Sequence, residues 1–159
     1  MNIPIKYLPN RLSSKDKKLQ LKQLKASRNA YKKNSYLTRK SVDSYKSKKS
    51  NHLLKAQKLY NVKNIAINSE LVSATGCSKN ALHKILKKGR GAYYSSGSRP
   101  NQTAHSWGYA RLASAISGGK AAAVDYKILE QGCILNSKAL KLAQQARNNG
   151  TRRVPKIRI

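Results

Sequence analysis

The stretch GRGAYYSSGSRPNQTAHSWGYARLASAISGG, residues 89–119, decides the fold that the sequence predicts. It contains the single Trp of the chain and three of its nine Tyr. Gly89, Gly91 and Gly97 permit positive φ angles, which predicts a tight, irregular, glycine-rich loop in the middle of the chain. A Thr in a good N-cap position then precedes apolar residues at helical spacing, which predicts a helix over residues 104–116.

The sequence leaves two interpretations of this central loop open. In the first, Tyr93, Tyr94 and Trp107 pack the loop onto the helix that follows, as an ordinary folded loop over a small core. In the second, the same aromatic residues join Arg99 and Arg111 in a surface that binds a partner.

The charge of the chain is extreme, because 34 Lys+Arg face only 5 Asp+Glu and the net charge is +29. Such a chain repels itself unless anions neutralise it, so the expected partner is a polyanion: nucleic acid, an acidic protein surface or anionic lipid. The charge is also uneven. Residues 1–60 hold 17 Lys and Arg with 2 acids, residues 92–136 hold 4 with 2 acids, and residues 137–159 hold 7 with none.

This distribution predicts a scaffold with two basic extensions rather than an enzyme. We expect a basic N-terminal arm over residues 1–50, a helical core over residues 51–147 and a basic C-terminal tail over residues 148–159. The segment 32–50 is either a solvated linker or a segment that orders on an acidic partner. The tail alternates basic and apolar residues, so we expect it either to add as a strand to a partner or to lie along an acidic surface. The partner-binding residues expected in the arm and tail are Lys17, Lys18, Lys32, Lys33, Arg152 and Arg153.

Helical spacing and capping residues predict a mainly α fold of about five to six helices with little strand. Ser13 or Ser14 is the expected N-cap of a helix that ends near Tyr31, and other Ser residues precede the helices expected at 51–60 and 138–147. A further helix is expected over residues 121–131.

Residues 69–89 predict two helices joined by a short turn that contains Gly76. The run TGCSKNALHKIL resembles the helix-turn-helix of bacterial repressors. That resemblance implies that Lys79, Asn80, His83 and Lys84 face a DNA groove. The alternative is an ordinary αα-hairpin that supports the core.

The sequence offers little material for catalysis or metal binding. Asp125 and Glu130 fall on different faces of one expected helix, so they form no acid–base pair, and the expected role of Asp125 is a salt bridge to Arg99 or Arg111. The three His and two Cys lack the spacing of metal ligands. Two Cys are too few for a disulfide framework, and no segment suits a secretory signal or a membrane span. We therefore expect a soluble, non-enzymatic protein without a cofactor, in a reducing compartment.

The block GRGAYYSSGSRPNQTAHSWGYARLASAISGGKAAAVDYKIL, residues 89–129, resembles an uncharacterised domain of large eukaryotic DNA viruses, of the algal-virus kind, and of some tailed phages. That family has no established activity, but the resemblance implies a viral setting. There, a small basic protein is commonly a particle component. The expected function is a minor capsid or cement protein of the virion, present in the host cell during assembly, whose arms bridge capsid or other virion proteins with acidic surfaces. The alternative is a DNA-binding protein of the genome-condensing or helix-turn-helix type.

Overall fold

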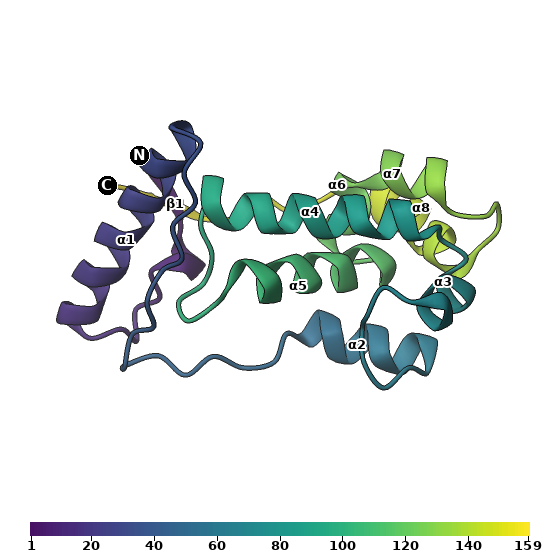
Figure 1. Ribbon diagram of the computed structural model, residues 1–159, viewed down its shortest axis with the longest axis horizontal. Coiled ribbons are helices and arrows are strands. Elements are labelled where there is room, and N and C mark those ends of the chain that lie inside the picture. Colours follow the sequence, from purple (N-terminus) through teal and green to yellow (C-terminus); the bar gives the residue numbers. More distant parts are fainter. The chain divides into compact units, whose positions relative to one another are not determined.

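The computed structural model describes residues 1–159 and is mainly α-helical, as the sequence predicts (Figure 1). It contains eight α-helices, one 3₁₀ helix (Ile5–Tyr7) and one two-stranded sheet. The helices are α1 (Ser14–Lys32), α2 (Asn51–Tyr60), α3 (Ser69–Thr75), α4 (Lys79–Ser95), α5 (Ala104–Ile116), α6 (Lys120–Val124), α7 (Tyr126–Gly132) and α8 (Lys138–Asn149), and the strands are β1 (Asn2–Pro4) and β2 (Lys156–Arg158). None of these helices combines the length and the apolar character needed to cross a bilayer.

The chain forms two compact units, which differ from the expected arm, core and tail. Unit 1 comprises Met1–Lys48, Arg90–Trp107 and Arg153–Ile159. Unit 2 comprises Lys49–Gly89 and Gly108–Arg152. Both ends of the chain therefore belong to one folded unit, together with the middle of the sequence.

Local capping signals fix most of the helix starts. Ser13 accepts a hydrogen bond from the backbone N–H of Asp16 at the start of α1, and Ser50 and Ser137 cap α2 and α8 in the same way. Before α5, the Thr103 hydroxyl accepts from the Ser106 N–H at 3.0 Å, and the Ser106 hydroxyl accepts from the Thr103 N–H at 3.0 Å. These bonds satisfy donors that a helix start would otherwise leave unpaired, which is why the predicted starts agree with the structure.

The predicted end of a helix at Gly89 is wrong, because α4 continues through Gly89 and Gly91 to Ser95. A Cβ atom at Gly89 would lie 2.7 Å from the Cα atom of Gly108 on α5. Glycine is therefore required there for close helix approach, and not for a turn. The irregular loop is shorter than expected and keeps one glycine with positive φ, Gly97 at 116°.

The core of unit 2 includes side chains from both helices that meet at Gly89 and Gly108, α4 and α5. Leu82 and Ile85 on α4 and Leu112 and Ile116 on α5 are all fully buried. Burying each such side chain contributes about 1.5–3 kcal/mol. The hydroxyl of Tyr60 on α2 donates a hydrogen bond to the carbonyl of Ile116, so α2 is tied to the same core.

Two features of unit 2 differ from the sequence-based expectation. The helix expected over residues 121–131 is divided at Asp125 into α6 and α7, since Asp125 takes φ −98° and ψ 21° at the end of α6. Cys77 and Cys133 form a disulfide across 56 residues, which the sequence did not predict. A cross-link that closes a loop of this length contributes about 4 kcal/mol in the chain-entropy description.

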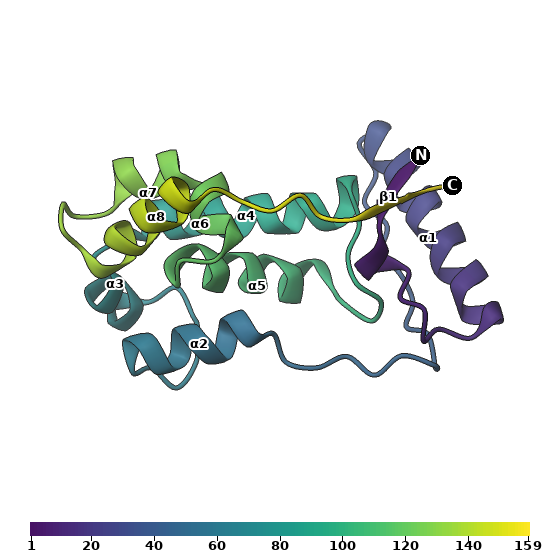
Figure 2. The same cartoon turned by 180° about the vertical axis from the view of Figure 1, so that it is seen from behind.

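In unit 1 the C-terminal tail pairs with the chain's own N-terminus. β2 lies antiparallel to β1, with Ile3 opposite Ile157 (Figure 2). The pairing extends to the chain ends, where the Met1 amino group donates to the Ile159 carbonyl at 3.0 Å. The tail thus forms a strand, as its sequence allows, but its partner is intramolecular.

The segment after α1, residues 33–48, which we call the basic segment, is held in place by contacts within the chain. Val42 and Tyr45 are buried, although the segment contains neither helix nor strand. The Gln23 side chain accepts from the Lys40 N–H at 2.5 Å and donates to the Lys40 carbonyl at 3.2 Å. The Asn101 side chain bonds both the N–H and the carbonyl of Val42 in the same way. Around Lys40 and Val42, side-chain amides therefore supply the hydrogen bonds that a neighbouring strand would give.

Candidate functional site

An ion cluster centres on the buried Asp125, which is 1 % exposed. Arg111 donates to both carboxylate oxygens at 2.8 Å, and the Lys88 ammonium lies 2.6 Å from Oδ1. Burial acts to raise the pKa of Asp125, but the hydrogen bonds and charges of Arg111 and Lys88 outweigh it and hold that pKa below its ordinary value. The salt bridge predicted from Asp125 to Arg111 is confirmed. Arg111, expected at a partner surface, thus makes an internal contact.

A buried cation, Arg39, is 9 % exposed and was not singled out from the sequence. Its guanidinium donates to the Ser27 hydroxyl at 2.9 Å, to the Tyr93 carbonyl at 2.8 Å and to the Ser98 hydroxyl at 2.8 Å. It also lies 3.7 Å from the centre of the Tyr93 ring. Burial lowers the pKa of Arg39 from its ordinary value. Nothing local marks this residue, because it is one of 17 Lys and Arg in the first sixty residues.

The partner of Arg39 is the C-terminal end of α4 rather than a carboxylate. Three carbonyls at or just beyond this end accept from side chains of unit 1: Tyr93 from Arg39, Tyr94 from Ser27, and Ser96 from Arg28. A helix C-terminus carries partial negative charge and unpaired carbonyls, so cations are favourable there. Within unit 1, Arg39 therefore anchors the basic segment to the C-terminal end of α4.

Two aromatic residues predicted at the partner surface have internal roles. Tyr93 is fully buried, and its hydroxyl accepts from the Arg39 N–H at 2.9 Å. Trp107 is partly buried and packs edge-on against Tyr7, with ring centres 5.9 Å apart. The interpretation in which Tyr93 and Trp107 hold the loop region to a small core fits these contacts.

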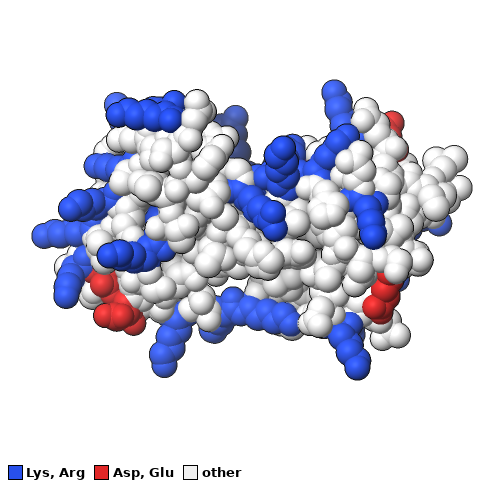
Figure 3. Space-filling view, in the orientation of Figure 1, with Lys and Arg blue, Asp and Glu red and all other residues white.

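The remaining predicted partner-binding cations face solvent. Figure 3 shows Lys and Arg side chains spread over the face in view, with few acidic atoms among them. The exposed members of the predicted set are Lys17, Lys18, Lys32, Lys33, Arg99, Arg152 and Arg153. The structure thus keeps these cations available to an anionic partner.

Three further tyrosines of unit 1 lie in a row near the surface. The ring centre of Tyr36 lies 6.0 Å from that of Tyr31 and 5.2 Å from that of Tyr94. Tyr36 is 63 % exposed and Tyr31 is 38 % exposed. The row continues inward to the buried Tyr93, whose ring centre is 5.1 Å from that of Tyr94. We call Tyr31, Tyr36 and Tyr94 the tyrosine row.

The two helices expected on either side of residue 76 are α3 and α4, and Gly76 has the left-handed conformation at the end of α3. The predicted groove-facing residues Lys79, Asn80, His83 and Lys84 are all exposed on α4. Their spacing of four residues within each pair places them on one side of the helix. The opposite side carries the buried Leu82 and Ile85.

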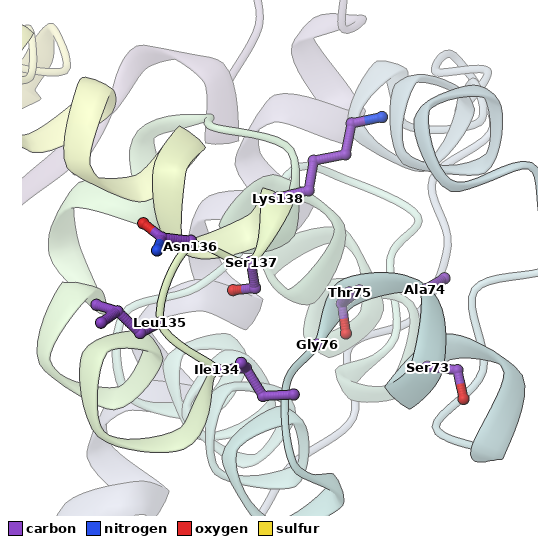
Figure 4. A pocket seen from close by; sticks show the side chains of 9 residues that line it. All are labelled: Ser73, Ala74, Thr75, Gly76, Ile134, Leu135, Asn136, Ser137 and Lys138. Carbon is purple, nitrogen blue, oxygen red and sulfur yellow. The ribbon is translucent and has the colours of Figure 1, made fainter.

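A pocket of about 250 Å³ lies in unit 2, between the end of α3 and the segment that leads into α8. Figure 4 shows the side chains that line it. Its polar side chains are Ser73, Thr75, Asn136, Ser137 and Lys138. No carboxylate or imidazole lines it, so it offers no acid–base pair. No group of three or more His, Cys, Asp or Glu is placed to hold a metal ion.

Comparison with known proteins gives one result. No curated protein and no solved structure matches the chain. Residues 4–130 match the family model described as a family of unknown function, DUF5824. This match extends well beyond the block at residues 89–129 and covers most of both units. The chain therefore belongs to the DUF5824 family.

Proposed function

We propose that this protein is a non-enzymatic structural component of a large DNA virus particle, and that its folded basic surface binds acidic neighbours. The observation that carries the proposal is the net charge of +29 on a chain whose basic ends are folded. One of the five acids, Asp125, is already neutralised internally. The charge of the surface must then be balanced from outside, and an acidic capsid protein would supply that balance.

The viral setting is supported by the resemblance of residues 89–129 to a domain of large DNA viruses and tailed phages. The mode of binding differs from the one that composition alone suggested. A disordered arm pays the entropy of ordering when it binds, whereas cations on a folded unit avoid most of that cost. Rigid presentation suits a cement protein, which must hold neighbours in one geometry.

The test is to purify particles of the virus that encodes this chain, treat them with nuclease, wash them in high salt and quantify the protein by mass spectrometry. We expect a fixed ratio to the major capsid protein that survives both treatments. Loss of the protein on nuclease treatment would assign it to the genome instead, and its absence from particles would refute the proposal.

A second candidate function is binding of duplex DNA through α3 and α4. The observation that favours it is the exposed side of α4 that carries Lys79, Asn80, His83 and Lys84. Neutralised phosphates release counterions, so affinity for DNA should fall steeply with salt.

This candidate is tested with the double variant Lys79→Ala, Lys84→Ala, and with Lys127→Ala, Lys141→Ala as a control that removes two exposed lysines elsewhere in unit 2. If α4 enters the groove, only the first pair weakens duplex binding strongly, and the slope of log K against log salt falls by about 2. Equal loss from both pairs would exclude groove binding by α4.

A further inference from the structure

We infer that the tyrosine row, together with Lys32, Lys33 and Arg90, forms a site for single-stranded nucleic acid. The inference goes beyond the proposed function, because it concerns a different ligand and one defined surface of unit 1. The site combines exposed aromatic rings with cations, which is the combination that binds single strands.

The rings of this site contact one another but stay outside the buried cores of the protein. Tyr31, Tyr36 and Tyr94 lie outside the three buried apolar clusters of the protein. Tyr36 exposes 63 % of its surface while it contacts a ring on each side. Exposing a large aromatic side chain forgoes the stabilisation that burial would give. A ligand that covers these rings would recover it.

Three exposed cations, Lys32, Lys33 and Arg90, are near the rings in the sequence. Lys32 and Lys33 follow Tyr31 directly at the end of α1, and both are exposed. Arg90 is exposed and precedes Tyr94 by one turn of α4, which places the two side chains on the same side of the helix. On α4 a ring and a positive charge therefore share one side of the helix, and the end of α1 adds two exposed lysines after Tyr31.

The site is also held in place before any ligand binds. The turn after α1 is fixed by the Asn34 N–H, which donates to the Tyr31 carbonyl at 3.0 Å, and by the Ser35 N–H, which donates to the Ala30 carbonyl at 2.9 Å. Three residues beyond Tyr36, the buried Arg39 bonds the Tyr93 carbonyl next to Tyr94. Both sides of the tyrosine row are thus anchored, which lowers the entropy lost on binding.

Single-stranded nucleic acid fits these features better than an acidic protein or a duplex. A carboxylate can neutralise the lysines but cannot use the faces of three aromatic rings. In a duplex the base faces are already stacked on each other, so only phosphates, sugars and base edges are accessible to a protein surface. An unpaired strand offers both phosphates and free base faces.

The experiment measures binding of the full chain to a labelled oligothymidylate of about 12 nucleotides by fluorescence anisotropy. Inorganic polyphosphate serves as a competitor without bases, and a duplex of the same length is measured in parallel. We expect Tyr36→Ala to weaken binding to the single strand about tenfold, which is the loss of one stacked base. Tyr36→Phe should keep the affinity, because the ring remains, whereas Tyr36→Leu should behave like the Ala variant.

The matched charge variants are Lys32→Ala, Lys33→Ala at the site and Lys17→Ala, Lys18→Ala at the other end of the same helix. The first pair should reduce the salt slope for the single strand by about 1.4, and the second should reduce it much less. Cross-linking to an oligonucleotide that carries iodouridine should label the peptide that contains Tyr36.

Wild-type affinity in Tyr36→Ala, an equal loss for polyphosphate or duplex, or cross-links that map elsewhere would each overturn the inference. These outcomes are distinct from those of the particle experiment. A protein that stays in nuclease-treated particles but fails these binding tests keeps the proposed function and loses the nucleic-acid site.

Discussion

Replacing Arg39 with Met is expected to destabilise unit 1 and to free the basic segment that follows α1. The variant removes three hydrogen bonds of 2.8–2.9 Å from a buried guanidinium. The hydroxyls of Ser27 and Ser98 keep other bonds, to the carbonyls of Tyr94 and Arg99. The main loss is at the Tyr93 carbonyl, whose bond to Arg39 closes the end of α4.

The magnitude follows from these contacts. Leaving a buried carbonyl unpaired costs about 1–3 kcal/mol. Removing a cation from a partly buried helix C-terminus costs up to about 2 kcal/mol. Relief of the desolvation of the guanidinium offsets part of this. The net expectation is a loss of about 2–4 kcal/mol, which lowers Tm by roughly 5–15 °C for a chain of this size.

The assay combines thermal unfolding followed by circular dichroism with limited trypsin digestion of the basic segment. The control is Lys40→Met, which changes the next residue. Its side chain is exposed and its backbone bonds to Gln23 remain, so stability should stay within about 0.5 kcal/mol of wild type. If the Arg39→Met variant has the same Tm as the wild type and resists trypsin equally, Arg39 does not anchor the basic segment and the reasoning fails.

Three further predictions concern residues of unit 2, with Gly91 of unit 1 as the control in one of them. Because the pKa of Asp125 is lower in the folded state, its contribution to stability is present above the ordinary carboxyl pKa and is lost as pH falls through the folded value. Denaturant midpoints measured between neutral and strongly acidic pH should show this fall. Asp125→Asn should reduce the fall and destabilise the protein by about 1.5–3 kcal/mol, because its two cationic partners are partly exposed. Gly89→Ala should destabilise the protein by about 1–3 kcal/mol, because the added methyl group meets a backbone carbon of α5. At Gly91 an added methyl group meets nothing within 4 Å, so Gly91→Ala should leave stability unchanged or raise it by up to about 1 kcal/mol. Equal denaturation midpoints for the two variants would contradict the close approach of α4 and α5. Reduction of the Cys77–Cys133 disulfide should lower Tm. A Cys77→Ser, Cys133→Ser variant with the same Tm as the oxidised wild type would exclude a stabilising role of the disulfide.

The parts of the fold that could be predicted from the sequence are those set by neighbouring residues. Ser13, Ser50 and Ser137 begin helices because their side chains bond N–H groups two or three residues ahead. Gly89 misled the prediction because its role depends on Gly108, nineteen residues away, and no local pattern distinguishes a packing glycine from a helix stop. Conformational freedom and small size are both properties of glycine, and only the tertiary neighbour decides which one is used.

The order of the basic segment was missed for the same reason. Its composition is typical of disorder, but Gln23 and Asn101 lie on either side of it in sequence and supply its backbone hydrogen bonds. The candidate site was predicted in part. The exposure of Lys79 and Lys84 follows from the apolar pattern of α4, whereas the burial of Tyr93 depends on Arg39, fifty-four residues away.

Hydrogen–deuterium exchange of the isolated monomer tests most directly whether the basic segments belong to a folded surface. The account predicts slow exchange at the N–H groups of Lys40, Val42 and Ser44, which donate to Gln23, Asn101 and Asp16, without any acidic partner present. Exchange at the rate of an unfolded chain, slowed only when a polyanion is added, would contradict it.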